Sequence, residues 1–244
     1  MIEENDPFMR TRLLIGEDAL QRLHDAFVAV VGLGAVGGFA TEALARSGVG
    51  RLRLIDGDTV SPSNINRQIL ALHSTVGQKK ASLAARRVKD IYPDCDVDAR
   101  PVFVHESELP DIFADKPDFV VDAIDSLTDK VNLIAFLRTN GIPFISCMGA
   151  AMRTDLTQIR IGTPDKVTHC PLTAAVRQRL RRRGVPLDFP CVYSCEPRDK
   201  LPKPVRPEGA GEKDRTVMGS LPSVTAVFGL TAAHHVIKTL TGLD

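Results

Sequence analysis

Short apolar runs alternate with amphipathic stretches along the first 150 residues. The wholly apolar run at 27–31 is typical of a strand buried on both faces of a parallel sheet. The complete pattern predicts helices over 8–24, 35–46, 79–89 and 128–139, and strands over 27–31, 52–56, 97–104, 118–122 and 142–146. This alternation predicts an α/β fold with a Rossmann-like, doubly wound and mostly parallel sheet.

The pattern changes after residue 151. Residues 157–161 alternate polar and apolar side chains, which favours an antiparallel strand with one solvated face. Further predicted elements are a basic helix over 171–183, a strand over 191–195, a flexible loop over 196–216 and a helix over 223–240. We therefore expect one domain over 1–244, with a nucleotide-binding half over 25–150 and an antiparallel C-terminal extension over 151–244 that serves substrate and dimer contacts.

The formal net charge is only +1, so no global field attracts a nucleic acid or a membrane. One segment departs from this balance, because residues 170–216 carry 11 Lys and Arg against 6 Asp and Glu. That local excess predicts a polyanionic partner, and a phosphate backbone suits the arginines of the basic helix, which are Arg177, Arg179, Arg181, Arg182 and Arg183. A solvated basic helix is the alternative interpretation.

The cysteines and the N-terminus indicate a reduced, cytoplasmic setting. There are five cysteines, an odd number, and the N-terminal residues are acidic and polar rather than those of a signal peptide. The longest apolar stretch, 221–240, contains two histidines and a lysine and is too polar for a membrane span. We expect no membrane association.

Three glycines follow the first predicted strand in the pattern Gly32-x-Gly34-x-x-Gly37. The first permits a tight turn, the second lets a phosphate or ribose approach the backbone, and the third permits close helix packing. The N-terminus of the next helix would add oriented N–H groups. Between a strand and a helix, this pattern indicates a nucleotide site, although it does not distinguish ATP from NAD, FAD or S-adenosylmethionine.

Asp56 lies 19 residues beyond Gly37, at the end of the second predicted strand. A carboxylate in this place suits hydrogen bonds from the two ribose hydroxyls. Asp58 is a secondary candidate for the same role, and a surface aspartate without a ligand is the alternative.

A polar cluster follows, which an ordinary dinucleotide site does not need. A guanidinium flanked by amides suits phosphate recognition, and Lys80, at the start of a helix, would add a point charge. The cluster comprises Asn64, Asn66, Arg67 and Gln68. Together with the glycines, these residues favour an enzyme that breaks a nucleoside triphosphate over a redox enzyme.

Asp122 and Asp125 end the fourth predicted strand, beside the expected crevice. A carboxylate there can hold Mg²⁺ through water and orient an α-phosphate for attack. We favour Asp125 as the metal residue, while a helix N-cap is the other role open to it.

This combination of residues resembles the active site of the ThiF/MoeB/E1-like adenylating superfamily, and the resemblance covers nearly the whole chain. It implies ATP with Mg²⁺, attack of a carboxylate on the α-phosphate, and release of pyrophosphate. It also implies a homodimer in which Arg12, from the N-terminal helix, enters the site of the opposite subunit. Asp56 would bind the ribose, Asn64, Arg67 and Lys80 the phosphates, and Asp125 the metal.

Departures from the superfamily pattern select a branch. Structural zinc needs paired Cys-x-x-Cys motifs, whereas Cys191 and Cys195 are spaced one residue too far, so we expect no zinc. The residues around Asp122–Ser126, the basic helix and Cys191–Glu196 resemble the branch that cyclises N6-threonylcarbamoyladenosine (t6A) at position 37 of tRNA.

That branch implies t6A-containing tRNA as substrate, an alkali-metal ion (Na⁺ or K⁺) near the strand ends, and a cysteine desulfurase with its sulfur acceptor as partners. The alternatives are an adenylyltransferase for the C-terminus of a sulfur-carrier or ubiquitin-like protein, and a non-catalytic Rossmann protein.

Overall fold

A seven-stranded sheet forms the centre of the computed structural model, which describes residues 6–197 and 217–243. The strands lie in the order β3-β2-β1-β4-β5-β7-β6, and all of them are parallel to their neighbours except β6, which is antiparallel to β7. Their bounds are Phe27–Val31 (β1), Arg51–Ile55 (β2), Asp96–Arg100 (β3), Phe119–Asp122 (β4), Phe144–Cys147 (β5), Ile159–Gly162 (β6) and Cys191–Ser194 (β7). The prediction of a doubly wound, mostly parallel sheet is confirmed.

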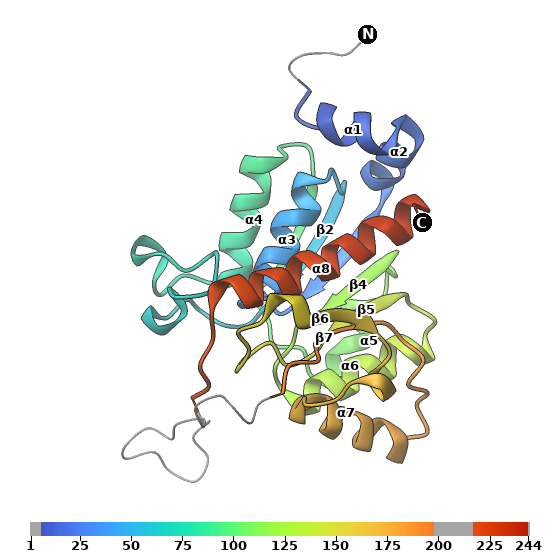
Figure 1. The fold of residues 1–244 in the computed structure, drawn as a ribbon. Coiled ribbons are helices and arrows are strands. Elements are labelled where there is room, and N and C mark those ends of the chain that lie inside the picture. Colours follow the sequence, from blue (N-terminus) through green and yellow to red (C-terminus); the bar gives the residue numbers. More distant parts are fainter. Residues whose placement is uncertain (1–5, 198–216, 244) are drawn as a thin grey trace.

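Helices cover both faces of this sheet (Figure 1). One face packs against α3, α4 and α8, with bounds Gly37–Arg46, Lys80–Ile91 and Pro222–Thr241. The other packs against α5, α6 and α7, with bounds Leu109–Ile112, Leu127–Thr139 and Pro171–Arg182. Burial on both faces explains why β1 is a continuous apolar run and why β4 is apolar up to Asp122.

The chain changes direction in the sheet between β1 and β4. It moves outward from β1 through β2 to β3, and then returns to the centre to place β4 beside β1. Adjacent strands whose connections leave in opposite directions create a crevice at their carboxyl ends, which is where open α/β sheets bind ligands. The glycine turn and Asp122 therefore lie on the two sides of one switch point.

Two predicted boundaries were wrong for clear physical reasons. The helix expected over 8–24 is divided into α1 (Met9–Ile15) and α2 (Glu17–Asp25) by Gly16, which has φ of +84°. The strand expected over 97–104 ends at Arg100, because Pro101 has no N–H to continue the ladder. Residues 102–105 consequently leave the sheet and form a loop at its carboxyl edge.

The C-terminal part completes the sheet. The strand β7 pairs in parallel with β5, so the antiparallel extension consists of β6 alone. Residues 198–216 of the predicted flexible loop lie outside the described residues. Glu196, at the start of that loop, is buried, and its carboxylate accepts hydrogen bonds from the backbone N–H groups of Thr154 and Asp155. In the described part of the chain, no helix has the length and apolar character needed to cross a membrane.

Candidate nucleotide site

The glycine turn packs directly against the end of β4. Gly32 has φ of +87°, and a Cβ there would stand 2.8 Å from the carbonyl oxygen of Ala123. A Cβ on Gly37 would lie 1.8 Å from the carbonyl oxygen of Gly32, so no side chain fits. Around Gly34, by contrast, the nearest atom is the Gln68 amide nitrogen at 3.8 Å from such a Cβ. Gly32 and Gly37 are thus required by the fold, while Gly34 leaves space where a ligand can approach.

Asp56 is tied to the glycine turn. One carboxylate oxygen accepts the N–H of Leu33 at 2.6 Å, and the other accepts the N–H of Asp58 at 2.8 Å. Burial raises the pKa of Asp56 above its ordinary value, although the charge of Lys80 and the two N–H groups oppose that effect. The predicted ribose carboxylate therefore lies at the end of β2, beside the turn.

Lys80 begins α4, and its side chain is only 6% exposed. Its ammonium lies 2.9 Å from a carboxylate oxygen of Asp58, which is itself 55% exposed. The backbone N–H of Lys80 also donates to the carbonyl of Asp58, so the lysine lies among the residues that follow β2. A phosphate that approached this point would compete with Asp58 for the ammonium group.

The polar cluster after β2 has divided roles. The side-chain oxygen of Asn64 accepts the N–H of Ser61 and closes the short turn Pro62–Asn64. Arg67 donates to the carbonyl of Ser63 at 2.9 Å and to the Asn66 side chain at 2.8 Å.

Two other amides of this cluster are also placed by the fold. Gln68 is buried beside Gly34, and its side-chain oxygen has no hydrogen-bond partner in the described part of the chain. Asn66 donates to the carbonyl of Ser220 at 3.3 Å, which links this loop to the entry of α8.

Asp122 and Asp125 have different environments. Asp122 is fully buried, and one of its carboxylate oxygens accepts from Lys130 at 2.7 Å and from Ser146 at 2.6 Å. Its other oxygen accepts the N–H of Ile124. Asp125 is exposed at the edge of the sheet. Since the oxygens of Asp122 are engaged inside the fold, Asp125 is the carboxylate that a metal ion at this edge could reach.

The buried pair Asp122–Lys130 was not anticipated from the sequence. Both side chains are inaccessible to solvent, and Ser146 from β5 donates to the carboxylate. The pair fixes the backbone between Asp122 and Ile124, directly where Gly32 packs against Ala123. The one indication in the sequence was that Lys130 shares a face of the predicted helix with apolar residues such as Ile134 and Leu137.

Arg12, on α1, lies far from the crevice. It forms ion pairs with Asp6, which precedes α1, and with Glu17 of α2, and α2 leads into the amino end of β1. The glycine turn is at the opposite, carboxyl end of that strand. Figure 1 accordingly shows α1 and α2 together at one extremity of the molecule.

The predicted basic surface lies on α7. Arg177 donates to the carbonyls of Pro164, Asp165 and Val167, so its guanidinium is engaged by its own chain. Arg179 donates to the Thr128 hydroxyl at 2.9 Å, close to Asp125 in sequence. The remaining arginines are exposed; Arg183 donates to the side chain of Asn132, and no partner is seen for Arg181 or Arg182 within residues 6–197 and 217–243.

The cysteines are mostly buried thiols. Burial raises the pKa of Cys95 to about 11 and those of Cys147 and Cys191 to about 12. Cys195 alone among the five is partly exposed. Across the described ranges, no group of three or more His, Cys, Asp and Glu side chains could hold a metal ion.

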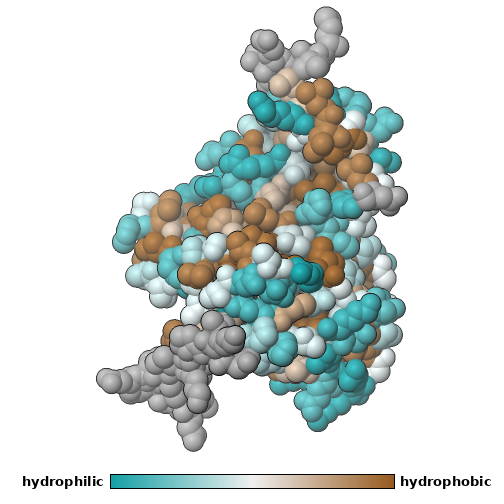
Figure 2. All heavy atoms as spheres, in the orientation of Figure 1, coloured by the Kyte–Doolittle hydropathy of each residue, from teal (hydrophilic) through white to brown (hydrophobic). Residues whose placement is uncertain are grey.

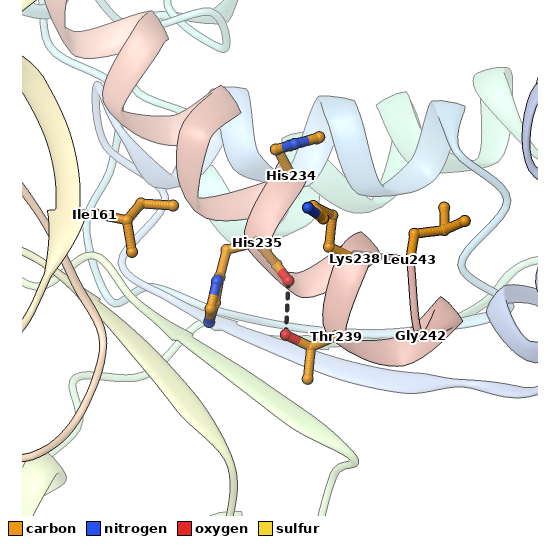
Figure 3. A pocket seen from close by; sticks show the side chains of 7 residues that line it. All are labelled: Ile161, His234, His235, Lys238, Thr239, Gly242 and Leu243. Carbon is orange, nitrogen blue, oxygen red and sulfur yellow. Dashed lines mark hydrogen bonds between the residues drawn. The ribbon is translucent and has the colours of Figure 1, made fainter.

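An open groove lies at the C-terminal end of α8, away from the glycine turn. Figure 3 shows that Ile161 from β6 faces His235 across this groove and that Lys238 and Thr239 follow one turn later on α8. Burial lowers the pKa of His235, and the charges of His234 and Lys238 lower it further. The groove contains none of the residues predicted to bind a nucleotide.

The sheet opens at a switch point, with a glycine turn on one side and a carboxylate and a lysine close by. This arrangement is typical of a nucleotide-binding α/β protein. The chain belongs to the ThiF family, whose sequence profile matches residues 8–244. The resemblance that the motifs indicated is thereby confirmed.

Two similar proteins are both called tRNA threonylcarbamoyladenosine dehydratase. The one from Bacillus subtilis is 39% identical over 238 residues, covering 96% of this chain and 94% of that protein. The one from Escherichia coli K12 is 38% identical over 248 residues, covering 96% and 92%.

Solved structures agree with this similarity. The E. coli enzyme, TcdA, in complex with AMP has a TM-score of 0.88 and 38% identity, covering 99% of this chain and 98% of that one. Its complex with ATP has a TM-score of 0.86 and 36% identity, covering 99% and 97%.

The buried ion pair generates a stability prediction. Lys130→Met should lower the free energy of unfolding by about 3–5 kcal/mol, because it leaves Asp122 charged and unpaired inside the protein. The double variant Asp122→Asn/Lys130→Met should recover most of that loss, since no buried charge remains and the Asn oxygen can still accept the N–H of Ile124. Urea unfolding at one fixed protein concentration measures both; a double variant less stable than Lys130→Met would contradict the prediction.

Proposed function

We propose that this protein uses ATP to cyclise t6A at position 37 of tRNA. The observation that carries the proposal is the similarity of nearly the whole chain to the tRNA threonylcarbamoyladenosine dehydratases, including TcdA bound to ATP and AMP. The crevice supports it, because a glycine turn, a carboxylate and a buried lysine converge there.

The first step is adenylation of the threonyl carboxylate of t6A. One carboxylate oxygen attacks the α-phosphorus of ATP, the bond to the β-phosphate oxygen breaks, and pyrophosphate leaves. Asp56 would accept hydrogen bonds from the ribose hydroxyls, while Lys80 and Arg67 would stabilise charge on the phosphates. Asn64 and Gln68 would add amide donors, and Gly34 leaves space for the phosphates to approach the turn.

Asp125 fits a role in holding Mg²⁺. It is an exposed carboxylate at the edge of the crevice, and hard oxygen ligands are those that Mg²⁺ prefers. When bound, the ion would neutralise phosphate charge and favour departure of pyrophosphate. The alkali-metal ion and the sulfur-transfer partners that the family resemblance implies stay predictions.

The second step closes the ring. The ureido nitrogen of t6A attacks the activated carbonyl carbon, the bond to the phosphate oxygen breaks, AMP leaves and the nitrogen loses its proton. The net change is the loss of one water from t6A and the conversion of ATP to AMP and pyrophosphate. Because the nucleophile and the electrophile belong to one nucleoside, proximity supplies much of the rate and no protein thiol is required.

The tRNA would bind along α7. Arg179 contacts Thr128, at the start of α6 and close to Asp125, so the basic surface begins beside the crevice. Arg181 and Arg182 are exposed and are the best placed to contact a phosphate backbone. Arg177 and Arg183 are engaged within the chain and would contribute charge rather than direct contacts.

A second copy of the chain would complete the site. Figure 2 shows apolar side chains gathered over α1 and along α8, where Leu13, Leu14 and Leu230 are exposed. Such a surface is typical of a protein interface. Since Arg12 neighbours Leu13 and lies away from its own crevice, it would enter the crevice of the partner subunit of a homodimer.

Nucleoside mass spectrometry on t6A-containing tRNA, incubated with the protein, ATP and Mg²⁺, tests the proposal. We expect t6A to lose the mass of one water, with one AMP formed for each nucleoside converted. Unchanged t6A in the presence of ATP binding would contradict the proposal and direct attention to the C-terminus of a carrier protein as the substrate.

Lys80→Ala and Asp125→Asn should each reduce cyclisation by roughly a hundredfold or more, because each removes a group that stabilises charge in the transition state. Circular dichroism should match that of the parent protein, since Asp125 is exposed and Lys80 is the first residue of α4, with its ammonium on the exposed Asp58. Turnover at the parent rate in either variant would show that the substituted residue has no part in catalysis.

Arg12→Ala should be inactive as a homodimer and complement Lys80→Ala in a heterodimer. One of the two sites then combines an intact Lys80 with an intact Arg12, so purified heterodimers should have about half of the parent activity. Two differently tagged, co-expressed subunits provide the sample. The matched control is a heterodimer of Lys80→Ala and Asp125→Asn subunits. It should be inactive, because both residues are expected to act within their own subunit and each site then lacks one of them. Absence of rescue with Arg12→Ala would mean self-contained sites.

Arg181→Ala/Arg182→Ala should weaken tRNA binding and reduce the slope of log Kd against log salt by about 2. ATP binding should be unchanged. Arg46→Ala/Lys89→Ala removes two exposed charges elsewhere and is the control for net charge. Equal slopes of log Kd against log salt for the two double variants would mean that α7 is a solvated basic helix and does not contact the tRNA.

A further inference from the structure

A single buried ring ties the N-terminal helix to the body of the subunit. None of the residues of α1 is buried, and Figure 1 shows this helix at one extremity of the molecule. Ile15, at its end, is only partly buried. Phe8, which directly precedes α1, is by contrast only 5% exposed. The direction in which α1 projects is therefore set at its two ends, by the seat of Phe8 and by the turn at Gly16.

Phe8 lies against two other rings, which come from different elements. Its ring centroid is 5.3 Å from that of His24, on α2, and 4.8 Å from that of Tyr92, which caps the end of α4. The ring planes meet at 69° and 74°, so both contacts are edge-to-face, an arrangement that aromatic pairs prefer. We call Phe8, His24 and Tyr92 the aromatic clamp.

The body of the fold fixes the clamp. Nδ1 of His24 lies 2.9 Å from the carbonyl oxygen of Gly48, and since a carbonyl only accepts, this nitrogen carries the proton. The hydroxyl of Tyr92 lies 3.1 Å from the same nitrogen. Gly48 has φ of +89°, and a Cβ there would lie 3.0 Å from Cε1 of His24. The turn between α3 and β2 thus leaves room for the imidazole and holds its orientation.

Phe8 and Arg12 are connected twice. The N–H of Arg12 donates to the carbonyl of Phe8 at 2.8 Å, at the start of α1. One carboxylate oxygen of Asp6 accepts the N–H of Phe8 at 2.8 Å, and the other accepts from Nη2 of Arg12 at 2.8 Å. Glu17, at the start of α2, pairs with the same guanidinium. The position of the Arg12 guanidinium therefore follows from the position of Phe8.

We propose that Phe8 is a positioning residue for Arg12, and that the aromatic clamp holds α1 so that this arginine reaches the crevice of the partner subunit. The inference rests on the proposed function in taking Arg12 as a residue that acts across the dimer. The end segments of a domain stay mobile unless something ties them down. With the clamp in place, α1 is ordered before the guanidinium meets a phosphate, and the entropy of ordering it is not lost during the reaction.

One helix links the clamp to the crevice of its own subunit. The helix α4 begins with Lys80 and is capped by Tyr92, so about 18 Å of helix separates the two, at 1.5 Å per residue. The same rigid element positions Lys80 at one end and supports the anchor of Arg12 at the other. A substitution of Tyr92 would disturb both ends, whereas a substitution of Phe8 tests the anchor alone.

Heterodimers of differently tagged subunits test this assignment. The Phe8→Ala homodimer should cyclise t6A roughly tenfold to a hundredfold more slowly than the parent, because a misplaced catalytic group costs about that much. Paired with Lys80→Ala, it should recover about half of the parent activity, since one site then combines an intact Lys80 with an Arg12 from a subunit whose clamp is intact. Paired with Arg12→Ala, it should be no faster than the Phe8→Ala homodimer, because neither subunit then presents Arg12 correctly.

The opposite pattern would overturn the assignment. Recovery with Arg12→Ala but not with Lys80→Ala would show that Phe8 acts on the crevice of its own subunit. A Phe8→Ala homodimer with the parent rate would overturn it as well, as would the absence of rescue between Arg12→Ala and Lys80→Ala. A loss of general stability predicts no difference between the two pairings, so the heterodimers distinguish positioning from a merely structural role.

Hydrogen exchange of the dimers reads the clamp without any substrate. Phe8→Ala should speed amide exchange across residues 9–15 by roughly tenfold or more, because local opening of α1 becomes easier, and should leave residues 80–91 unchanged. Phe8→Leu keeps an apolar side chain and should lie closer to the parent. Phe113→Ala removes a similarly buried ring on the other face of the sheet and is the control, with exchange in α1 unchanged.

The outcomes separate this inference from the proposed function. Parent protein that binds ATP but leaves t6A unchanged would defeat the cyclisation, while faster exchange in α1 of Phe8→Ala would still support the clamp. Unchanged exchange in α1 of Phe8→Ala would overturn the clamp even if the parent protein cyclises t6A.

Discussion

The close contact between the glycine turn and the end of β4 is the constraint on which the rest of the site depends. Gly32 approaches the carbonyl of Ala123 so closely that no side chain fits between them, and Gly37 lies against Gly32 in turn. This contact holds the start of α3 and the residues around Asp125 on opposite sides of one crevice. A nucleotide bound there would meet helix N–H groups from one wall and carboxylates from the other.

Charge at this edge is divided between the interior and the surface. Asp122 is neutralised by Lys130 within the sheet, so it supports the backbone and is not available to a ligand. Asp56 and Lys80 are partly withdrawn from water, which strengthens their interactions with a ligand because the local dielectric is lower than that of solvent. Asp125 is more accessible than either of them. The crevice therefore combines a rigid base with side chains that can adjust to phosphates.

Local patterns were sufficient to predict where the strands and the glycine turn lie, and burial on both faces of the sheet leaves β1 as a wholly apolar run. Contacts between distant residues could not be predicted in this way. The bond of Asn66 to Ser220 joins positions 154 apart, and the pairing of Lys130 with Asp122 depends on how α6 packs on β4. The loop over 102–105 was hidden inside a predicted strand, although Pro101 was a local sign that the ladder ends there.

The burial of the thiols has a consequence for the lifetime of the protein. An acyl-adenylate is an electrophile that would react with any thiolate within reach, and such a reaction would inactivate the subunit by self-acylation. Cys147 lies at the end of β5, close to the crevice in the fold, but its thiol is enclosed and its pKa of about 12 keeps it protonated at neutral pH. The fold thereby keeps the Cys147 thiol from reacting with an acyl-adenylate formed in the crevice.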